Sequence, residues 1–130
     1  IAKGAAAIMV EKQVEAKGIS IVRVKDSRRA LAAIARNFYK NPTGELKLIG
    51  ITGTNGKTTT TYLINAILEE DRKKSSIIGT IAIRAGKEEI PASRTTPESL
   101  ELQQIFRQLL DKGAEYAVME VSSHALDLGR

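Results

Sequence analysis

Short apolar runs and longer amphipathic stretches follow one another along the chain. Runs rich in β-branched residues predict strands at 6–10, 19–24, 46–52, 76–83 and 116–121. Stretches with apolar residues three and four positions apart predict helices at 26–39, 57–72 and 95–113. Gly86 predicts that the fourth run turns back into a hairpin ending near Ile90. Strands that alternate with helices are typical of an α/β domain with a mainly parallel sheet.

Each predicted helix has one apolar face that is expected to point towards a core. Thr95, with Pro97 and Glu98 close behind, predicts the start of the third helix and a cap on it. The predicted faces are Leu31, Ile34, Ala35 and Phe38; then Leu63, Ile64, Ile67 and Leu68; then Leu102, Ile105, Phe106 and Leu109.

A cluster of turn-forming residues divides the chain. The sequence Asn-Pro-Thr-Gly at 41–44 stops the first helix and marks the best candidate for a domain boundary. Residues 1–45, with two predicted strands and one predicted helix, are therefore expected to belong to a small α/β domain, and 46–130 to a second domain. The chain starts without Met and ends just after a predicted strand, so we expect it to be part of a longer protein.

The composition is that of a globular protein and excludes several kinds of site. Of the 130 residues, 42% are apolar and 27% are charged. Cysteine is absent, which excludes disulfides, thiolate zinc sites and cysteine nucleophiles. No apolar run approaches the roughly 20 residues that cross a bilayer, and no signal peptide is evident. The expectation is a cytoplasmic protein that acts as a monomer without a membrane partner.

The net charge of +5 does not by itself indicate a nucleic-acid partner. The basic excess lies in the first 50 residues and forms no block of like charges. Aromatic residues, on which bases would stack, make up only 4% of the chain. We therefore expect no nucleic-acid binding, and the mild basic bias suits a small polyanionic ligand.

The strongest chemical signal is a glycine-rich loop between a predicted strand and a predicted helix. It contains Gly53, Gly56, Lys57 and Thr58 in the pattern Gly-x-x-Gly-Lys-Thr. Glycines let backbone N–H groups approach phosphate oxygens, and the following helix points its positive end at the same phosphates. Lys57 would supply a charge for the β- and γ-phosphates, and Thr58 a hydroxyl for Mg²⁺. The longer Gly-x-x-x-x-Gly-Lys-[Ser/Thr] pattern fails, because its first position is Ile51.

A second cluster follows the last predicted strand. Glu120 ends this strand, and ligands of open α/β sheets bind beyond the carboxyl ends of strands. A carboxylate there could hold Mg²⁺ opposite Thr58, or could be satisfied by neighbouring groups. Ser122 and His124 come next; a Ser–His hydrolase pair is disfavoured because no Gly-x-Ser-x-Gly elbow is present. His124 fits either a loop histidine with satisfied nitrogens or a group near phosphate or metal.

Together these motifs resemble the Mur ligase family. The resemblance rests on the run from Gly53 to Thr59, on Thr95-Thr96-Pro97-Glu98, and on the run from Met119 to Leu126, and it extends to Arg130. Residues 26–42 also resemble the end of the family's N-terminal domain. Within the family, the resemblance is greatest to the members that add the third residue of the peptidoglycan stem peptide.

The resemblance implies a reaction and its partners. ATP would phosphorylate the γ-carboxylate of UDP-MurNAc-L-Ala-D-Glu, and the amine of diaminopimelate or lysine would displace the phosphate from the acyl phosphate. Residues 1–45 would end the UDP-substrate-binding domain, and 46–130 would begin the central ATP-binding domain. The uridine-binding segment, a carbamylated lysine and the C-terminal domain would lie outside these residues, so the chain alone is not expected to turn over substrate.

The resemblance also assigns roles to single residues. ATP would be bound by Gly53, Thr54, Asn55, Gly56, Lys57, Thr58 and Thr59. Mg²⁺ would be held by Thr58 and Glu120, with Lys57, Glu120 and His124 as the catalytic set. The UDP-substrate would be contacted by Thr95, Thr96, Ser122 and Arg130.

Two other functions remain open on the sequence. A ligase of the folylpolyglutamate synthase type uses the same acyl-phosphate chemistry, but its loop reads Gly-Lys-Gly-Ser, whereas Thr58 and Thr59 follow Lys57 here. A nucleotide-binding switch without ligation is the second alternative. A GTPase is disfavoured because no guanine-reading Asn-Lys-x-Asp sequence is present.

Overall fold

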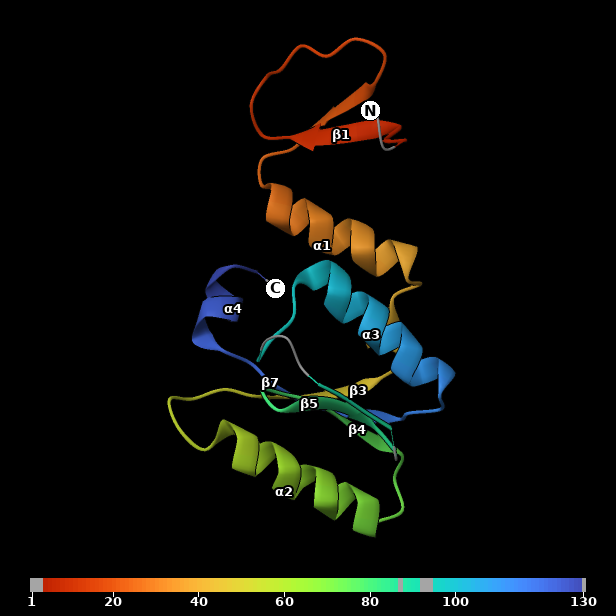
Figure 1. Cartoon of the computed structure of the whole chain (residues 1–130), viewed down its shortest axis with the longest axis vertical. Helices are drawn as coiled ribbons and strands as arrows, with labels where there is room; N and C mark the ends of the chain where they lie inside the picture. Colours follow the sequence, from red (N-terminus) through yellow and green to blue (C-terminus); the bar gives the residue numbers. More distant parts are fainter. Residues whose placement is uncertain (1–3, 87, 92–94, 130) are drawn as a thin grey trace.

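The structure, a computed structural model, describes residues 4–86, 88–91 and 95–129. Its centre is a five-stranded sheet with the strand order β3-β7-β4-β5-β6, and a separate two-stranded sheet pairs β1 with β2 (Figure 1). The strands are β1 (Ala7–Val10), β2 (Ser20–Arg23), β3 (Lys47–Ile51), β4 (Ser75–Ile78), β5 (Ala82–Ala85), β6 (Glu88–Pro91) and β7 (Tyr116–Glu120). The helices are α1 (Ser27–Phe38), the short 3-10 turn η1 (Pro42–Gly44), α2 (Lys57–Glu70), α3 (Ser99–Asp111) and α4 (Ser123–Asp127).

The expected α/β architecture is confirmed, and the sheet has a parallel and an antiparallel part. Strands β3, β7 and β4 are parallel neighbours, whereas β5 and β6 are added to β4 in antiparallel pairings. Ile51 at the end of β3 pairs with Glu120 at the end of β7. The carboxyl ends of these two strands therefore lie at the same edge of the sheet, beside the start of α2 (Figure 1).

The prediction of one strand over 76–83 is wrong. The chain turns between Ile78 and Ala82, where the Gly79 N–H donates to the Ala82 carbonyl at 3.1 Å, and two antiparallel strands result. An apolar run cannot distinguish one strand from two when the turn itself is short. The expected hairpin at Gly86 is confirmed, because β5 and β6 pair on either side of it and Gly86 has φ +60°.

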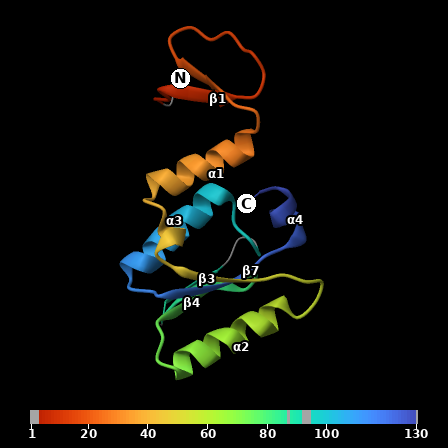
Figure 2. The same ribbon diagram turned by 180° about the vertical axis from the view of Figure 1, so that it is seen from behind.

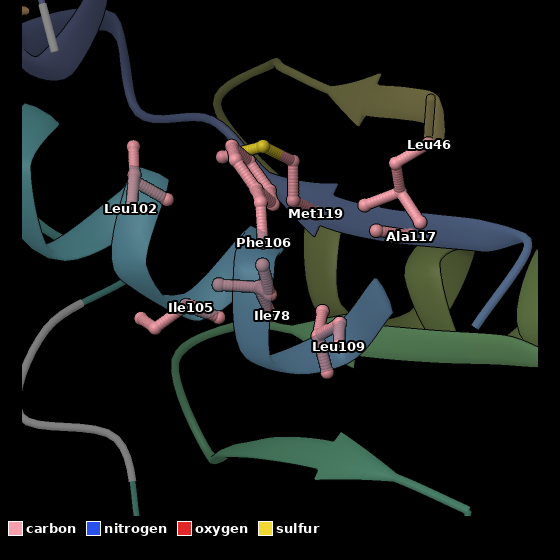
Figure 3. Packing of buried hydrophobic residues seen from close by; sticks show 8 residues of the cluster. All are labelled: Leu46, Ile78, Leu102, Ile105, Phe106, Leu109, Ala117 and Met119. Atoms are coloured by element: carbon pink, nitrogen blue, oxygen red, sulfur yellow. The ribbon is translucent and has the colours of Figure 1, made fainter. Parts of the chain in front are cut away.

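Helices cover both faces of the large sheet. Helix α2 lies on one face and α3 on the other, while α1 lies beyond α3 (Figures 1 and 2). The apolar face predicted for α3 is confirmed, since Leu102, Ile105, Phe106 and Leu109 are all buried. They pack against the sheet in one cluster with Leu46, Ile78, Ala117 and Met119 (Figure 3).

Within the described residues, none of the helices combines the length and hydropathy that a membrane span requires.

The apolar face predicted for α2 is only partly right. Leu63 and Ile67 are 60% and 68% exposed, whereas Thr61 and Asn65 are fully buried against the sheet. Thr61 and Asn65 lie three and seven residues after Thr58, so they share its face of the helix. Thr58 donates to Glu120 at the end of β7, so the stripe that begins at Thr58 is the one that faces the sheet.

Helix α1 begins and ends near the expected residues but buries little. Asp26 caps it, accepting a hydrogen bond from the Arg29 N–H at 3.0 Å. Of its predicted apolar face only Ala35 is buried, and Phe38 is 75% exposed.

Before the helix, hydrogen bonds from the side chain and backbone of Ser27 lower the pKa of the Glu11 carboxyl. The division of the chain near residue 45 stays a prediction.

A residue just after α2 offers a test of backbone strain. Arg72 has φ +57°, and the N–H groups of Arg72 and Lys73 close the helix on the carbonyls of Glu69 and Leu68. Replacing Arg72 by glycine should raise the free energy of unfolding by about 0.5–1 kcal/mol, because glycine adopts this left-handed conformation without strain. Urea denaturation measures the change. Arg72→Ala, which removes the same charge but keeps a β-carbon, should give no such gain; an equal gain would assign the effect to charge.

Candidate functional site

The phosphate loop predicted from the sequence joins β3 to α2. Gly53 has φ +144° and Gly56 has φ +77°, both in the region that favours glycine. Gly56 is the residue that caps α2, and its carbonyl accepts from the Thr60 N–H at 2.9 Å. The two glycines therefore set the loop's course and direct the N-terminal N–H groups of α2 into it, as an anion-binding loop requires.

Lys57, the first residue of α2, folds back over this loop. It is half-buried, and its Nζ donates to the Gly53 carbonyl at 2.8 Å. The ammonium group is thus held above the turn rather than in bulk solvent. An anionic oxygen in the loop would offer this ammonium a stronger partner than the carbonyl does.

Glu120 lies at the end of β7 with its carboxylate turned towards α2. Its side chain is on the same face of the sheet as that of Val118, two residues before it. It is 1% exposed, and its Oε2 accepts from the Thr58 hydroxyl at 3.0 Å. The structure therefore brings together the two residues predicted to hold Mg²⁺.

Thr80, in the turn between β4 and β5, is a site residue that the sequence motifs did not indicate. Its N–H donates to Glu120 Oε1 at 3.0 Å, and its hydroxyl reaches Glu120 Oε2 at 3.0 Å. A β-carbon on the preceding Gly79 would lie 2.5 Å from Glu120 Oε1, so any other residue there would displace the carboxylate from this position. A glycine inside an apparent strand was the available signal, since it marks a bulge or a close approach.

The segment containing Thr95 and Thr96 does not cap α3 as predicted. The helix begins at Ser99, and its capping residue is Glu98. Thr96 precedes Pro97, which disfavours helical backbone at that position. Thr96 is buried, its hydroxyl donates to the Glu120 carbonyl at 3.0 Å, and its Oγ1 accepts from the Ser122 N–H at 3.1 Å. The hydroxyl of Thr95 lies 3.0 Å from that of Thr80.

The remaining predicted residues lie beyond β7. Ser122 caps α4, because its Oγ accepts from the Ala125 N–H at 3.1 Å. His124 is exposed on α4, and no group of three potential metal ligands occurs among the residues that the structure describes. Arg130 lies outside the described residues. The structure therefore leaves the roles predicted for Ser122, His124 and Arg130 untested.

These contacts surround a cavity of about 370 Å³ at the carboxyl edge of the sheet. It is lined by Thr54, Asn55, Gly56, Lys57, Thr58, Thr59, Thr80, Thr95 and Glu120. Among residues 4–86, 88–91 and 95–129, no lysine, arginine or histidine forms an ion pair with Glu120. A buried carboxylate held only by hydroxyl and N–H donors, with a second oxygen from Thr58, fits a hard cation such as Mg²⁺.

Comparison with known proteins gives a family model and close relatives. The family model described as the Mur ligase middle domain matches residues 51–130. The UDP-N-acetylmuramoyl-L-alanyl-D-glutamate--2,6-diaminopimelate ligase of Caldanaerobacter subterraneus is 50% identical over the whole chain, and that of Alkaliphilus oremlandii is 52% identical. The chain covers 27% of each of these relatives. It therefore spans about a quarter of their length.

Solved structures agree with this similarity. A structure of UDP-N-acetylmuramoyl-L-alanyl-D-glutamate--2,6-diaminopimelate ligase superposes with a TM-score of 0.82 at 27% identity, covering 98% of this chain and 26% of the other. A crystal structure of MurF from Acinetobacter baumannii superposes with a TM-score of 0.50 at 27% identity, covering 94% of this chain and 23% of the other.

Proposed function

Because the chain belongs to the Mur ligase family, we propose that it supplies the nucleotide-binding part of an ATP-dependent ligase that adds 2,6-diaminopimelate to UDP-MurNAc-L-Ala-D-Glu. The γ-carboxylate of the D-Glu residue would be activated as an acyl phosphate before the amine attacks. The observation that carries the proposal is the buried carboxylate of Glu120 facing Thr58 at the end of a phosphate loop. The names of the relatives favour diaminopimelate over lysine as the acid added.

On the nucleotide side, each residue of the chain has a separate task. The loop 53–59 would wrap the phosphates with its N–H groups, and Lys57 would move from the Gly53 carbonyl to a phosphate oxygen. Glu120 and Thr58 would hold Mg²⁺, which when bound neutralises charge on the transferring phosphoryl group. Both side chains would be in place for the ion, because β7 and α2 hold their oxygens 3.0 Å apart.

On the substrate side, the UDP-MurNAc-dipeptide would be contacted by Thr95, Thr96, Ser122 and Arg130. His124 would be a catalytic group. Thr95 lines the cavity and is the best placed of the described candidates. Thr96 and Ser122 already use their side chains to fix the end of β7 and the start of α4, so their contribution would be to shape the site.

We also propose the domains to which these residues belong, and the oligomeric state and location of the ligase. Residues 1–45 would close an N-terminal UDP-substrate domain and 46–130 would open the central ATP-binding domain. The ligase would act as a monomer in the cytoplasm.

A direct test uses the full-length protein with ATP, Mg²⁺ and UDP-MurNAc-L-Ala-D-Glu, and varies only the third amino acid. Phosphate release and a product heavier by one diaminopimelate residue, both dependent on meso-2,6-diaminopimelate, are expected. Mass spectrometry identifies the product. Turnover with L-lysine alone would correct the acid added, and phosphate release that needs no amino acid would indicate a nucleotide hydrolase without ligation.

A further inference from the structure

Thr80 contacts both the metal-side carboxylate and a residue predicted to contact the substrate. Its N–H and its hydroxyl each lie 3.0 Å from an oxygen of Glu120, and its hydroxyl is also 3.0 Å from that of Thr95. Thr80 lies in the turn after β4, 40 residues before Glu120. Neither the phosphate-loop motif nor the Thr95–Glu98 motif includes it.

We propose that Thr80 is a positioning residue that holds Glu120 ready for Mg²⁺ and links the metal site to Thr95. This inference rests on the proposed function, because it assigns Thr80 a task towards the metal and substrate of the same site.

The contacts on Glu120 divide its two oxygens between separate tasks. Oε1 is fixed by the Thr80 N–H and lies against Gly79, where any β-carbon would collide with it. Oε2 receives the hydroxyls of both Thr58 and Thr80. Oε2 is therefore the oxygen turned towards the phosphate loop, and the turn 79–80 prevents the side chain from rotating it away.

The hydroxyl of Thr80 has one proton for two neighbouring oxygens. Because a carboxylate can only accept, Thr80 donates to Glu120 and accepts from Thr95 when both bonds form. Of the two hydroxyls on Oε2, that of Thr58 would turn its oxygen to a bound cation, whereas that of Thr80 would keep donating to Glu120. Thr95, Thr80 and Glu120 then form one chain of hydrogen bonds, so a substrate that fixes Thr95 would also fix the carboxylate on the metal side.

The first test measures how much Mg²⁺ the full-length protein needs to bind a non-hydrolysable ATP analogue, by isothermal titration at a series of Mg²⁺ concentrations. Thr80→Val removes only the hydroxyl from an exposed turn, and it should raise the Mg²⁺ for half-maximal binding about tenfold, the typical weight of a hydrogen bond to a charged group. Thr80→Ser restores the hydroxyl and should stay within about threefold of wild type. Thr43→Val, in η1 and outside the cavity, is the matched control and should leave the Mg²⁺ concentration for half-maximal binding unchanged.

The second measurement addresses the link to Thr95. With saturating UDP-MurNAc-L-Ala-D-Glu, wild type should need less Mg²⁺ for nucleotide binding, because a substrate that fixes Thr95 also fixes the Thr80 hydroxyl on Glu120. In Thr80→Val this decrease should be lost, while circular dichroism and the Mg²⁺-free affinity for the nucleotide match wild type and show an intact loop.

The outcomes separate this inference from the proposed function. A Mg²⁺ requirement in Thr80→Val within twofold of wild type, or a substrate effect that survives the substitution, overturns the role given to Thr80 and leaves the proposed function standing. Nucleotide binding that does not depend on Mg²⁺ in wild type overturns both. If Thr80→Ser needs as much Mg²⁺ as Thr80→Val, the role given to Thr80 is also overturned, since loss of the hydroxyl would not be the cause of the raised requirement.

Discussion

Lys57→Ala in the full-length protein should lower the rate of ligation by about a thousandfold or more, the scale of losing one preorganised charge at a phosphoryl-transfer site. The protein should still fold, because the side chain is half-buried and its Nζ contacts only the Gly53 carbonyl among the hydrogen bonds of the described residues. Phosphate release in the presence of all three substrates measures the rate, and circular dichroism checks the fold.

A matched lysine separates this effect from general loss of charge. Lys73 lies just beyond the other end of α2, is paired with Asp71 at 3.6 Å, and does not line the cavity at the phosphate loop. Lys73→Ala should ligate at the wild-type rate. If Lys57→Ala retains activity within tenfold of wild type, Lys57 is not the phosphate-binding group that we propose.

Glu120→Gln should raise the Mg²⁺ concentration for half-maximal activity by about tenfold or more and lower activity at saturating ATP by about a hundredfold, because an amide is a poor ligand for a hard cation. The substitution keeps the shape of a side chain that is 1% exposed, and the Thr80 N–H can still donate to the amide oxygen. A Mg²⁺ titration of phosphate release gives both quantities.

The control for Glu120 removes an equal charge elsewhere. Glu101 is exposed on α3, and Glu101→Gln should leave the Mg²⁺ titration unchanged. A Glu120→Gln titration that overlays that of wild type would mean that the buried carboxylate serves the fold, through its bonds to Thr58 and Thr80, and not a metal.

Local sequence determines the features of this protein whose causes lie within a few residues. Gly56 specifies the left-handed turn before α2, and Asp26 specifies the start of α1, since both act on the backbone beside them. The apolar face of α3 predicts its own burial, because every residue three or four positions on points the same way. The phosphate loop and the carboxylate at the end of β7 could be predicted for the same reason.

Other features depend on which distant segments the sheet brings together. Thr80 reaches Glu120 only because β7 inserts between β3 and β4, a strand order that no local pattern encodes. The α3 cap predicted at Thr95 failed because Thr96 bonds instead to the end of β7, 24 residues away.

The buried face of α2 is another feature that local sequence did not predict. Its most apolar face, with Leu63 and Ile67, is exposed, and Thr61 and Asn65 are buried although no partner is found for Thr61 Oγ1 or the Asn65 amide within the described part of the chain. The buried stripe begins at Thr58, which lies opposite Glu120, and only the assembled sheet brings these two residues together. Sequence periodicity predicted the helix, whereas its packing in the tertiary structure decided which side of it faces the sheet.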